Sequence, residues 1–178
     1  MITMNNTVDT VQDETTKGDL KLVQRLGMNS RQEAALLQIG FRFYQQGRFA
    51  DAKNIFEGLA LLDETNAYVH GILGSLYQRE GKDEAAISSY NAAILLFDND
   101  VDSHVNRGEL FLKLGKFQEA AEDFATAIHL DPPRKNRASN RARLLVAITQ
   151  DALKLGKEKG IEAVQQERNR LKQTQGRR

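Results

Sequence analysis

The sequence contains no cysteine and no tryptophan, and its only two prolines, Pro132 and Pro133, are adjacent. Without cysteine, the chain can form neither a disulfide nor a thiolate metal site, which suits a reducing compartment. No hydrophobic run approaches the roughly 20 residues that cross a bilayer, so we expect no membrane insertion. Residues 1–11 lack the apolar core of a secretory signal. We therefore expect a cytoplasmic protein.

Charge is unevenly distributed along the 178 residues. Residues 1–133 carry 12 Lys and Arg against 20 Asp and Glu, a balance of −8, whereas residues 134–178 carry 13 against 4, a balance of +9. The length suits one domain, and an apolar content of 40% is ordinary for a globular protein. We interpret the basic region as a solvated, charge-rich terminal helix and expect no nucleic-acid partner.

A 34-residue repeat organises the middle of the chain. A shift of 34 residues aligns five columns of like residues: Gly40/Gly74/Gly108, Gly47/Gly81/Gly115, Ala52/Ala86/Ala120, Phe43/Tyr77/Phe111 and Phe56/Tyr90/Phe124. This period and these columns resemble the tetratricopeptide pattern, in which each repeat is a helical hairpin. Small residues allow two helix axes to approach to about 8–10 Å, and aromatic rings fill the wider gaps beside them.

The repeat predicts an all-α fold of three helical hairpins, a tetratricopeptide-repeat solenoid. We expect the helices at about 31–46, 49–62, 67–80, 83–96, 101–114 and 117–130. The column that begins with Gly47 should end the first helix of each hairpin in a left-handed conformation. Ser30 and Glu33 have the spacing of a capping box for the first helix, and Pro132 stops the last one.

The expected organisation has three parts. Residues 1–29 form an N-terminal segment, partly disordered, with a short amphipathic helix at Leu20–Leu26 as one possibility. Residues 30–135 contain the three repeats, at about 33–66, 67–100 and 101–134. Residues 136–178 contain a C-terminal capping helix at 137–155, which a solenoid end needs to cover its apolar face, and then a basic helix or tail.

Nothing in the sequence predicts catalysis, a cofactor or a metal site. His70 and His104 lie one repeat apart at a packing position, and two histidines offer too few ligands for zinc. No serine has a histidine partner in a recognisable arrangement. We therefore expect a binding protein that is not an enzyme.

The first helix of each repeat should line the concave side of the stack. Helical spacing from the Gly40 column places a set of neighbours there. We predict a peptide-binding groove formed by Leu37, Phe41, Tyr44, Gln45, Tyr68, Ile72, Gln78, Glu109 and Leu112, with Ser75, Arg79, Val105, Asn106 and Lys113 beside them. Exposed aromatic residues in a concave surface commonly mark binding sites, although the N-terminal segment or a partner subunit could cover them instead.

The residues that line the predicted groove favour an extended client with apolar side chains. Some tetratricopeptide proteins hold the C-terminal carboxylate of heat-shock chaperones with Lys, Asn and Arg on this face. Here the matching positions carry Leu37, Phe41, Asp102 and Asn106, so that clamp is absent.

The chain also resembles a narrower family, the class II chaperones of type III secretion. The resemblance lies in the stretch Phe41–Phe49 (FRFYQQGRF), at Leu59, Leu62 and Asp63, at Ala86, Ile87 and Tyr90, and at Gly108, Glu109 and Leu112. It implies a cytoplasmic chaperone that holds an extended segment of a hydrophobic translocator in its groove, and a possible homodimer through its N-terminal region. The competing hypothesis is a scaffold or adaptor subunit of a bacterial envelope or pilus assembly complex.

Overall fold

The computed structural model describes the backbone of residues 27 and 29–175 and the side chains of residues 27, 29–156, 166 and 168. The expected disorder near the N-terminus and the short helix at Leu20–Leu26 lie outside the described residues. Within the described residues the structure has seven helices, α3 to α9, and no strand. The all-α prediction is confirmed for this part of the chain.

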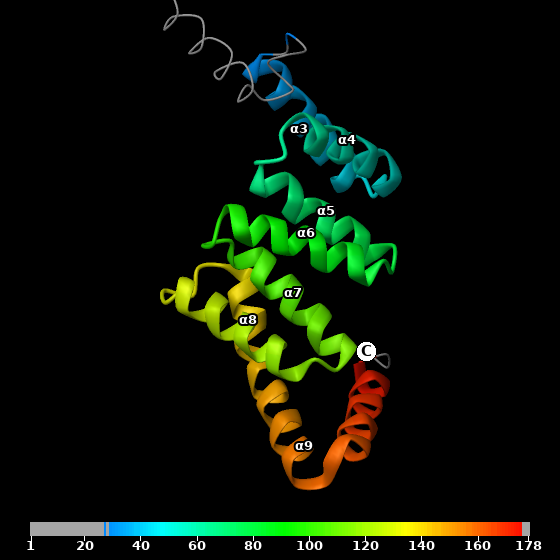
Figure 1. Ribbon diagram of the computed structural model, residues 1–178, viewed down its shortest axis with the longest axis vertical. Coiled ribbons are helices and arrows are strands. Elements are labelled where there is room, and N and C mark those ends of the chain that lie inside the picture. The colour runs from blue at the N-terminus through cyan, green and yellow to red at the C-terminus, as the bar shows by residue number, and fades with distance from the viewer. Residues whose placement is uncertain (1–26, 28, 176–178) are drawn as a thin grey trace, which may run out of the picture. The chain divides into compact units, whose positions relative to one another are not determined.

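The chain forms two compact units, Met1–Val69 and His70–Arg178. In the first unit, α3 (Ser30–Gln45) packs against α4 (Phe49–Leu62), and α5 (Ala67–Arg79) begins. The second unit contains the rest of α5, followed by α6 (Asp83–Leu96), α7 (Val101–Leu114), α8 (Phe117–Leu130) and α9 (Arg137–Gln175). Figure 1 shows the helices that form each hairpin side by side.

The six hairpin helices lie where the repeat predicts them, with every end within one residue. Gly47, Gly81 and Gly115 have φ values of +74°, +73° and +79°, which confirms the left-handed turn after the first helix of each hairpin. The predicted capping box is wrong by one residue. Asn29 is the N-cap: its Oδ1 accepts from the Gln32 backbone N–H at 3.0 Å, and its own N–H donates to Gln32 Oε1 at 2.9 Å.

The predicted columns form the cores of the hairpins. Ala52, Ala86 and Ala120 are completely buried, as are Phe56, Tyr90 and Phe124. The Gly40 column gives these rings their space, because a Cβ atom on Gly108 would lie 2.7 Å from Cε1 of Phe124. The Gly40, Ala52 and Phe56 columns therefore repeat the residue types that the core of each hairpin requires.

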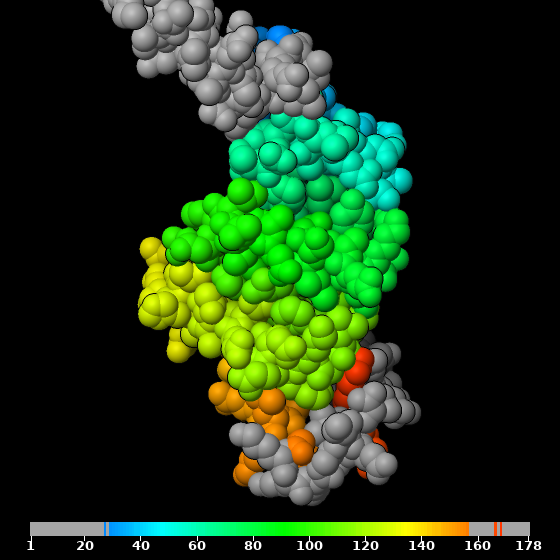
Figure 2. Space-filling model, in the orientation of Figure 1, coloured from blue at the N-terminus to red at the C-terminus, as the bar shows by residue number. Residues whose placement is uncertain are grey.

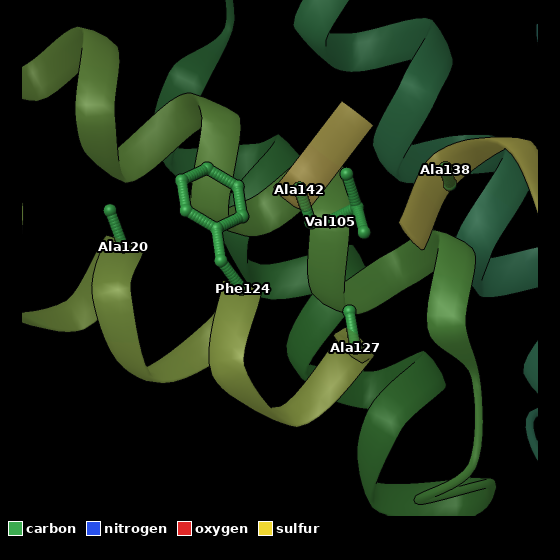
Figure 3. Close-up of a cluster of buried hydrophobic side chains, with 6 residues drawn as sticks. All are labelled: Val105, Ala120, Phe124, Ala127, Ala138 and Ala142. Atoms are coloured by element: carbon green, nitrogen blue, oxygen red, sulfur yellow. The ribbon is translucent and has the colours of Figure 1, made fainter. Parts of the chain in front are cut away.

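Helix α9 covers the last hairpin, which α7 and α8 form. Ala138 and Ala142 of α9 are buried against Val105, Phe124 and Ala127 of α7 and α8 (Figure 3). The predicted capping helix is thus present, as the first part of a longer helix that continues to Gln175. The Asp131 carboxylate fixes the connection between α8 and α9, since it accepts from Ser139 Oγ at 2.5 Å and from the backbone N–H of Asn136 at 2.9 Å.

Candidate functional site

The predicted groove residues of the first hairpin share one side of α3. Leu37, Phe41 and Gln45 are spaced four residues apart, which places them one above another along the helix. Leu37 is half-buried, Gln45 is exposed, and Phe41 leaves 41% of its surface accessible. Gly40 faces α4, with Ile55 and Phe56 against it, so the fold does not require an aromatic ring at Phe41. This side of α3 presents apolar surface to solvent.

Tyr44 lies at the end of the same side of α3. Its ring is half-buried and meets the Phe49 ring edge-on, with the centroids 5.5 Å apart and the planes at 76°. Edge-to-face aromatic pairs are favourable, so this contact orients the Tyr44 ring. Phe49 begins α4, and Gly47 forms the turn between the two helices.

The predicted groove residues Tyr68, Ile72 and Gln78 of α5 differ in their burial and hydrogen bonding. Tyr68 is 53% exposed, and partial burial raises the pKa of its phenol because desolvation disfavours the phenolate. Ile72 is half-buried. Gln78 accepts a hydrogen bond from the buried Tyr90 hydroxyl at 2.8 Å, so its amide oxygen helps to hold the core of the second hairpin.

In the third hairpin, the predicted groove residues meet α9. Glu109 pairs with Arg141, with Oε1 and Nε 2.8 Å apart, and Asn106 Oδ1 accepts from the same guanidinium at 3.0 Å. Leu112 packs against the buried cluster between α7, α8 and α9. The expectation that Val105 lines the groove is wrong, because its side chain is completely buried in that cluster.

A buried polar network in the third hairpin was not predicted. His104 Nδ1 lies 3.0 Å from Asp123 Oδ1, and Arg107 donates to both oxygens of the same carboxylate, at 2.6 and 2.8 Å. His104 Nε2 lies 3.2 Å from the carbonyl oxygen of Asp98. These contacts agree with a structural role for His104. Only the position of His104 in a packing column signalled the burial, and nothing in the sequence marked Asp123 as its partner.

Three observations bear on other kinds of site. Among the residues that the structure describes, no three His, Cys, Asp or Glu side chains form a group that could hold a metal ion. No described helix is both long and apolar enough to span a bilayer. Further large apolar side chains are exposed outside the predicted groove, among them Leu61 at 77% and Leu95 at 87%.

Comparison with known proteins gives two matches to models of the tetratricopeptide repeat, over residues 37–101 and 101–133, which together span more than half of the chain. DnaJ homolog subfamily C member 3 from Gallus gallus is 30% identical over 118 residues, which are 66% of this chain but 23% of that protein. Low calcium response locus protein H from Yersinia pseudotuberculosis is 28% identical over 131 residues, covering 72% of this chain and 76% of that one.

One solved structure is similar to this chain over nearly all of its own length. PcrH, crystallised with the chaperone-binding region of PopD, is 28% identical, with a TM-score of 0.66. The match covers 70% of this chain and 96% of the PcrH chain. Almost all of that PcrH chain therefore has a counterpart here, whereas part of this chain lies outside the match.

Proposed function

We propose, on the premise that this chain belongs to the tetratricopeptide-repeat family, that it is a chaperone for a secreted translocator. It holds an extended, apolar segment of this client on the inner side of its hairpins. The observation that carries the proposal is the likeness to PcrH in complex with the chaperone-binding region of PopD, at 28% identity across 96% of that chain. The similarity to low calcium response locus protein H supports the same class of protein.

The geometry of α3 supports an apolar client. Phe41 is exposed although no core position requires it, and Leu37 and Tyr44 extend the apolar surface along the same helix side. Aromatic side chains that can be fully desolvated by a partner typically contribute most of the binding free energy. We therefore place the anchors of the site at Phe41 and Tyr44, with Leu37, Gln45, Tyr68 and Ile72 as further contacts. Gln78, Glu109 and Leu112 belong to the predicted groove but also hold contacts within the fold.

We further propose that the chain acts in the cytoplasm, needs no cofactor, catalyses no reaction and can assemble as a homodimer. The alternative function is a scaffold or adaptor subunit of an envelope or pilus assembly complex. The proteins that co-purify with the native chain distinguish the two, since a chaperone releases a free secreted client whereas an adaptor stays with membrane-complex subunits.

The binding test uses a synthetic peptide of the chaperone-binding region of PopD together with co-purification of native partners. Truncation of one anchor typically costs about 2 kcal/mol or more, so Phe41→Ala with Tyr44→Ala should weaken peptide binding by at least about thirtyfold. Isothermal titration calorimetry measures this loss. Leu61→Ala is the matched control, because Leu61 is a large exposed apolar residue of the same unit outside the predicted site.

The control should bind like the parent chain, and both variants should keep the parent's circular dichroism spectrum. A folded double variant that binds as tightly as the parent would place the site elsewhere on the molecule. Equal losses in the double variant and in Leu61→Ala would indicate unspecific hydrophobic binding. If no translocator segment binds or co-purifies, the chaperone proposal is wrong and the adaptor alternative takes its place.

A further inference from the structure

Helix α9 contacts α7 at two places that lie close together on α7. Arg141, in the first part of α9, pairs with Glu109. Arg168, much further along α9, donates from Nη2 to the backbone carbonyl of Lys113. Its other terminal nitrogen, Nη1, would lie 3.3 Å from a Cβ atom on Gly115, so the guanidinium lies directly against the turn that ends α7.

These two contacts require α9 to double back. An α-helix rises 1.5 Å per residue, so Glu109 and Lys113 lie roughly 6 Å apart along α7. The same rise would separate Arg141 and Arg168 by roughly 40 Å in a straight helix, which far exceeds the reach of an arginine side chain. Figure 1 shows this bend: the orange part of α9 runs away from α7, and the red part returns to the end of α7. In Figure 2, the red atoms lie against the yellow-green surface near that end.

The sequence supplies a reason for the bend. Gly156 and Gly160 lie in α9 between the two contacts, four residues apart. Glycine is among the weakest helix formers, and sharp kinks in helices occur at glycine. The two glycines therefore make this stretch the natural hinge of the helix.

The two parts of α9 are held in different ways. The first part contributes buried side chains, Ala138, Ala142 and Thr149, and cannot leave without opening the core. The described contact of the returning part is the Arg168 hydrogen bond, which is favoured by the negative end of the α7 dipole. Arg168 Nε, however, is buried without a hydrogen-bond partner in the structure. An unsatisfied buried donor costs about as much as one such hydrogen bond contributes, so the Arg168 contact by itself adds little net stability.

We propose that residues 161–175, the part of α9 beyond the glycine hinge, form a strap that closes over the C-terminal end of α7. Arg168 is its latch. The strap opens by motion at Gly156 and Gly160, while the first part of α9 stays fixed in the core. Because Arg168 contacts the Lys113 carbonyl and lies against Gly115, opening uncovers the C-terminal end of α7. The strap itself does not depend on the proposed client.

The absence of cysteine makes the strap directly measurable. Glu119→Cys in α8 and Gln166→Cys in the strap replace exposed residues, and each cysteine receives a nitroxide spin label. Double electron–electron resonance then reports the distance between α8 and the strap in the full chain. A closed strap gives one narrow distance, the one expected from the structure. An open strap gives a broad distribution at longer distances.

Three variants of the labelled chain show whether the latch, the net charge or the hinge keeps the strap closed. Arg168→Ala removes the latch and should convert the narrow distance into the broad distribution. Arg170→Ala removes the same charge two residues away and should keep the narrow distance. Gly156→Ala with Gly160→Ala stiffens the hinge, favours a straight helix and should also open the strap. The thermal transition should stay unchanged in the two arginine variants, because the core contacts of α9 remain. In the double glycine variant it should not fall, because alanine is favoured over glycine in a helix.

Several results of the distance measurement would contradict the proposed strap. A broad distribution in the parent chain, or a narrow distance that persists in Arg168→Ala, would overturn the proposal. Equal opening in the Arg168 and Arg170 variants would also overturn it, because net charge rather than the latch would then hold the strap. No client takes part in this measurement, so its result stands whether or not the PopD peptide binds.

Discussion

Replacement of Gly74 by alanine tests the packing of the second hairpin most sharply. A Cβ atom at this position would lie 2.5 Å from Cε1 and 2.6 Å from Cδ1 of Tyr90, distances that no packed side chain tolerates. Tyr90 is completely buried, and its hydroxyl donates to Gln78 Oε1 at 2.8 Å. The ring therefore cannot move aside without straining its surroundings and weakening this hydrogen bond.

The magnitude follows from three effects. Overpacking a core typically costs about 1–3 kcal/mol, and the loss of a hydrogen bond costs about 0.5–1.5 kcal/mol. In the opposite direction, alanine is more favourable than glycine in a helix interior by about 1 kcal/mol. The net expectation is that Gly74→Ala lowers the free energy of unfolding by about 2 kcal/mol.

Gly58 provides the matched control, because it also lies within a helix but has no atom within 4 Å of an added Cβ. Gly58→Ala should therefore raise the free energy of unfolding by about 1 kcal/mol, the helix-propensity gain alone. Urea denaturation followed by circular dichroism at 222 nm measures both variants. A Gly74→Ala chain as stable as Gly58→Ala would mean that the close approach of Gly74 and Tyr90 does not exist in solution.

Two further predictions concern the core and the connection before α9. Ala86 is completely buried beside Tyr90 and Leu110, so Ala86→Leu should overpack the hairpin and cost about 1–3 kcal/mol, read from the same urea curves. An unchanged unfolding midpoint would refute that packing. The Ser139 hydroxyl, the backbone N–H groups of Asn136 and Lys135 and the Arg143 charge hold the pKa of Asp131 below its usual value. A lowered folded pKa gives stability that is present above the unfolded pKa of about 3.9 and is lost as pH falls through the folded value. The parent chain should thus unfold at higher urea than Asp131→Asn at pH 7, and the difference should shrink below about pH 4. A difference that stays constant down to pH 2 would contradict this assignment.

The hairpins could be predicted from sequence because their core is local and periodic. Residues in the columns of Ala52 and Phe56 meet partners within the same repeat, so one period encodes both sides of each contact. The N-cap of α3 was harder to predict, because Ser30 and Asn29 are both good N-cap residues and only the backbone distinguishes them. The structure selects Asn29, whose partner is Gln32 rather than Glu33.

The position of α9 could not be predicted in the same way. Its contacts join residues that no single repeat contains, such as Glu109 with Arg141, 32 residues apart, and Asp131 with Ser139 across a helix boundary. No repeat contains these pairs, so self-comparison carries no information about them. The sequence does show apolar residues for a cap and two glycines beyond it, but a bend and its direction depend on what the returning part contacts.

The predicted site follows from the positions at which the repeats differ. Positions that pack within a hairpin keep their residue type every 34 residues, whereas the inner-face positions change: Phe41 corresponds to Ser75 and Glu109, and Tyr44 corresponds to Gln78 and Leu112. The structure gives a reason for the change at the third repeat, where Glu109 and Leu112 have partners in or near α9. At the first repeat, Phe41 has no such role and remains exposed. An aromatic residue that the fold does not require and covers only in part is the kind of residue that a client segment would bury, and this is why the binding test begins at Phe41.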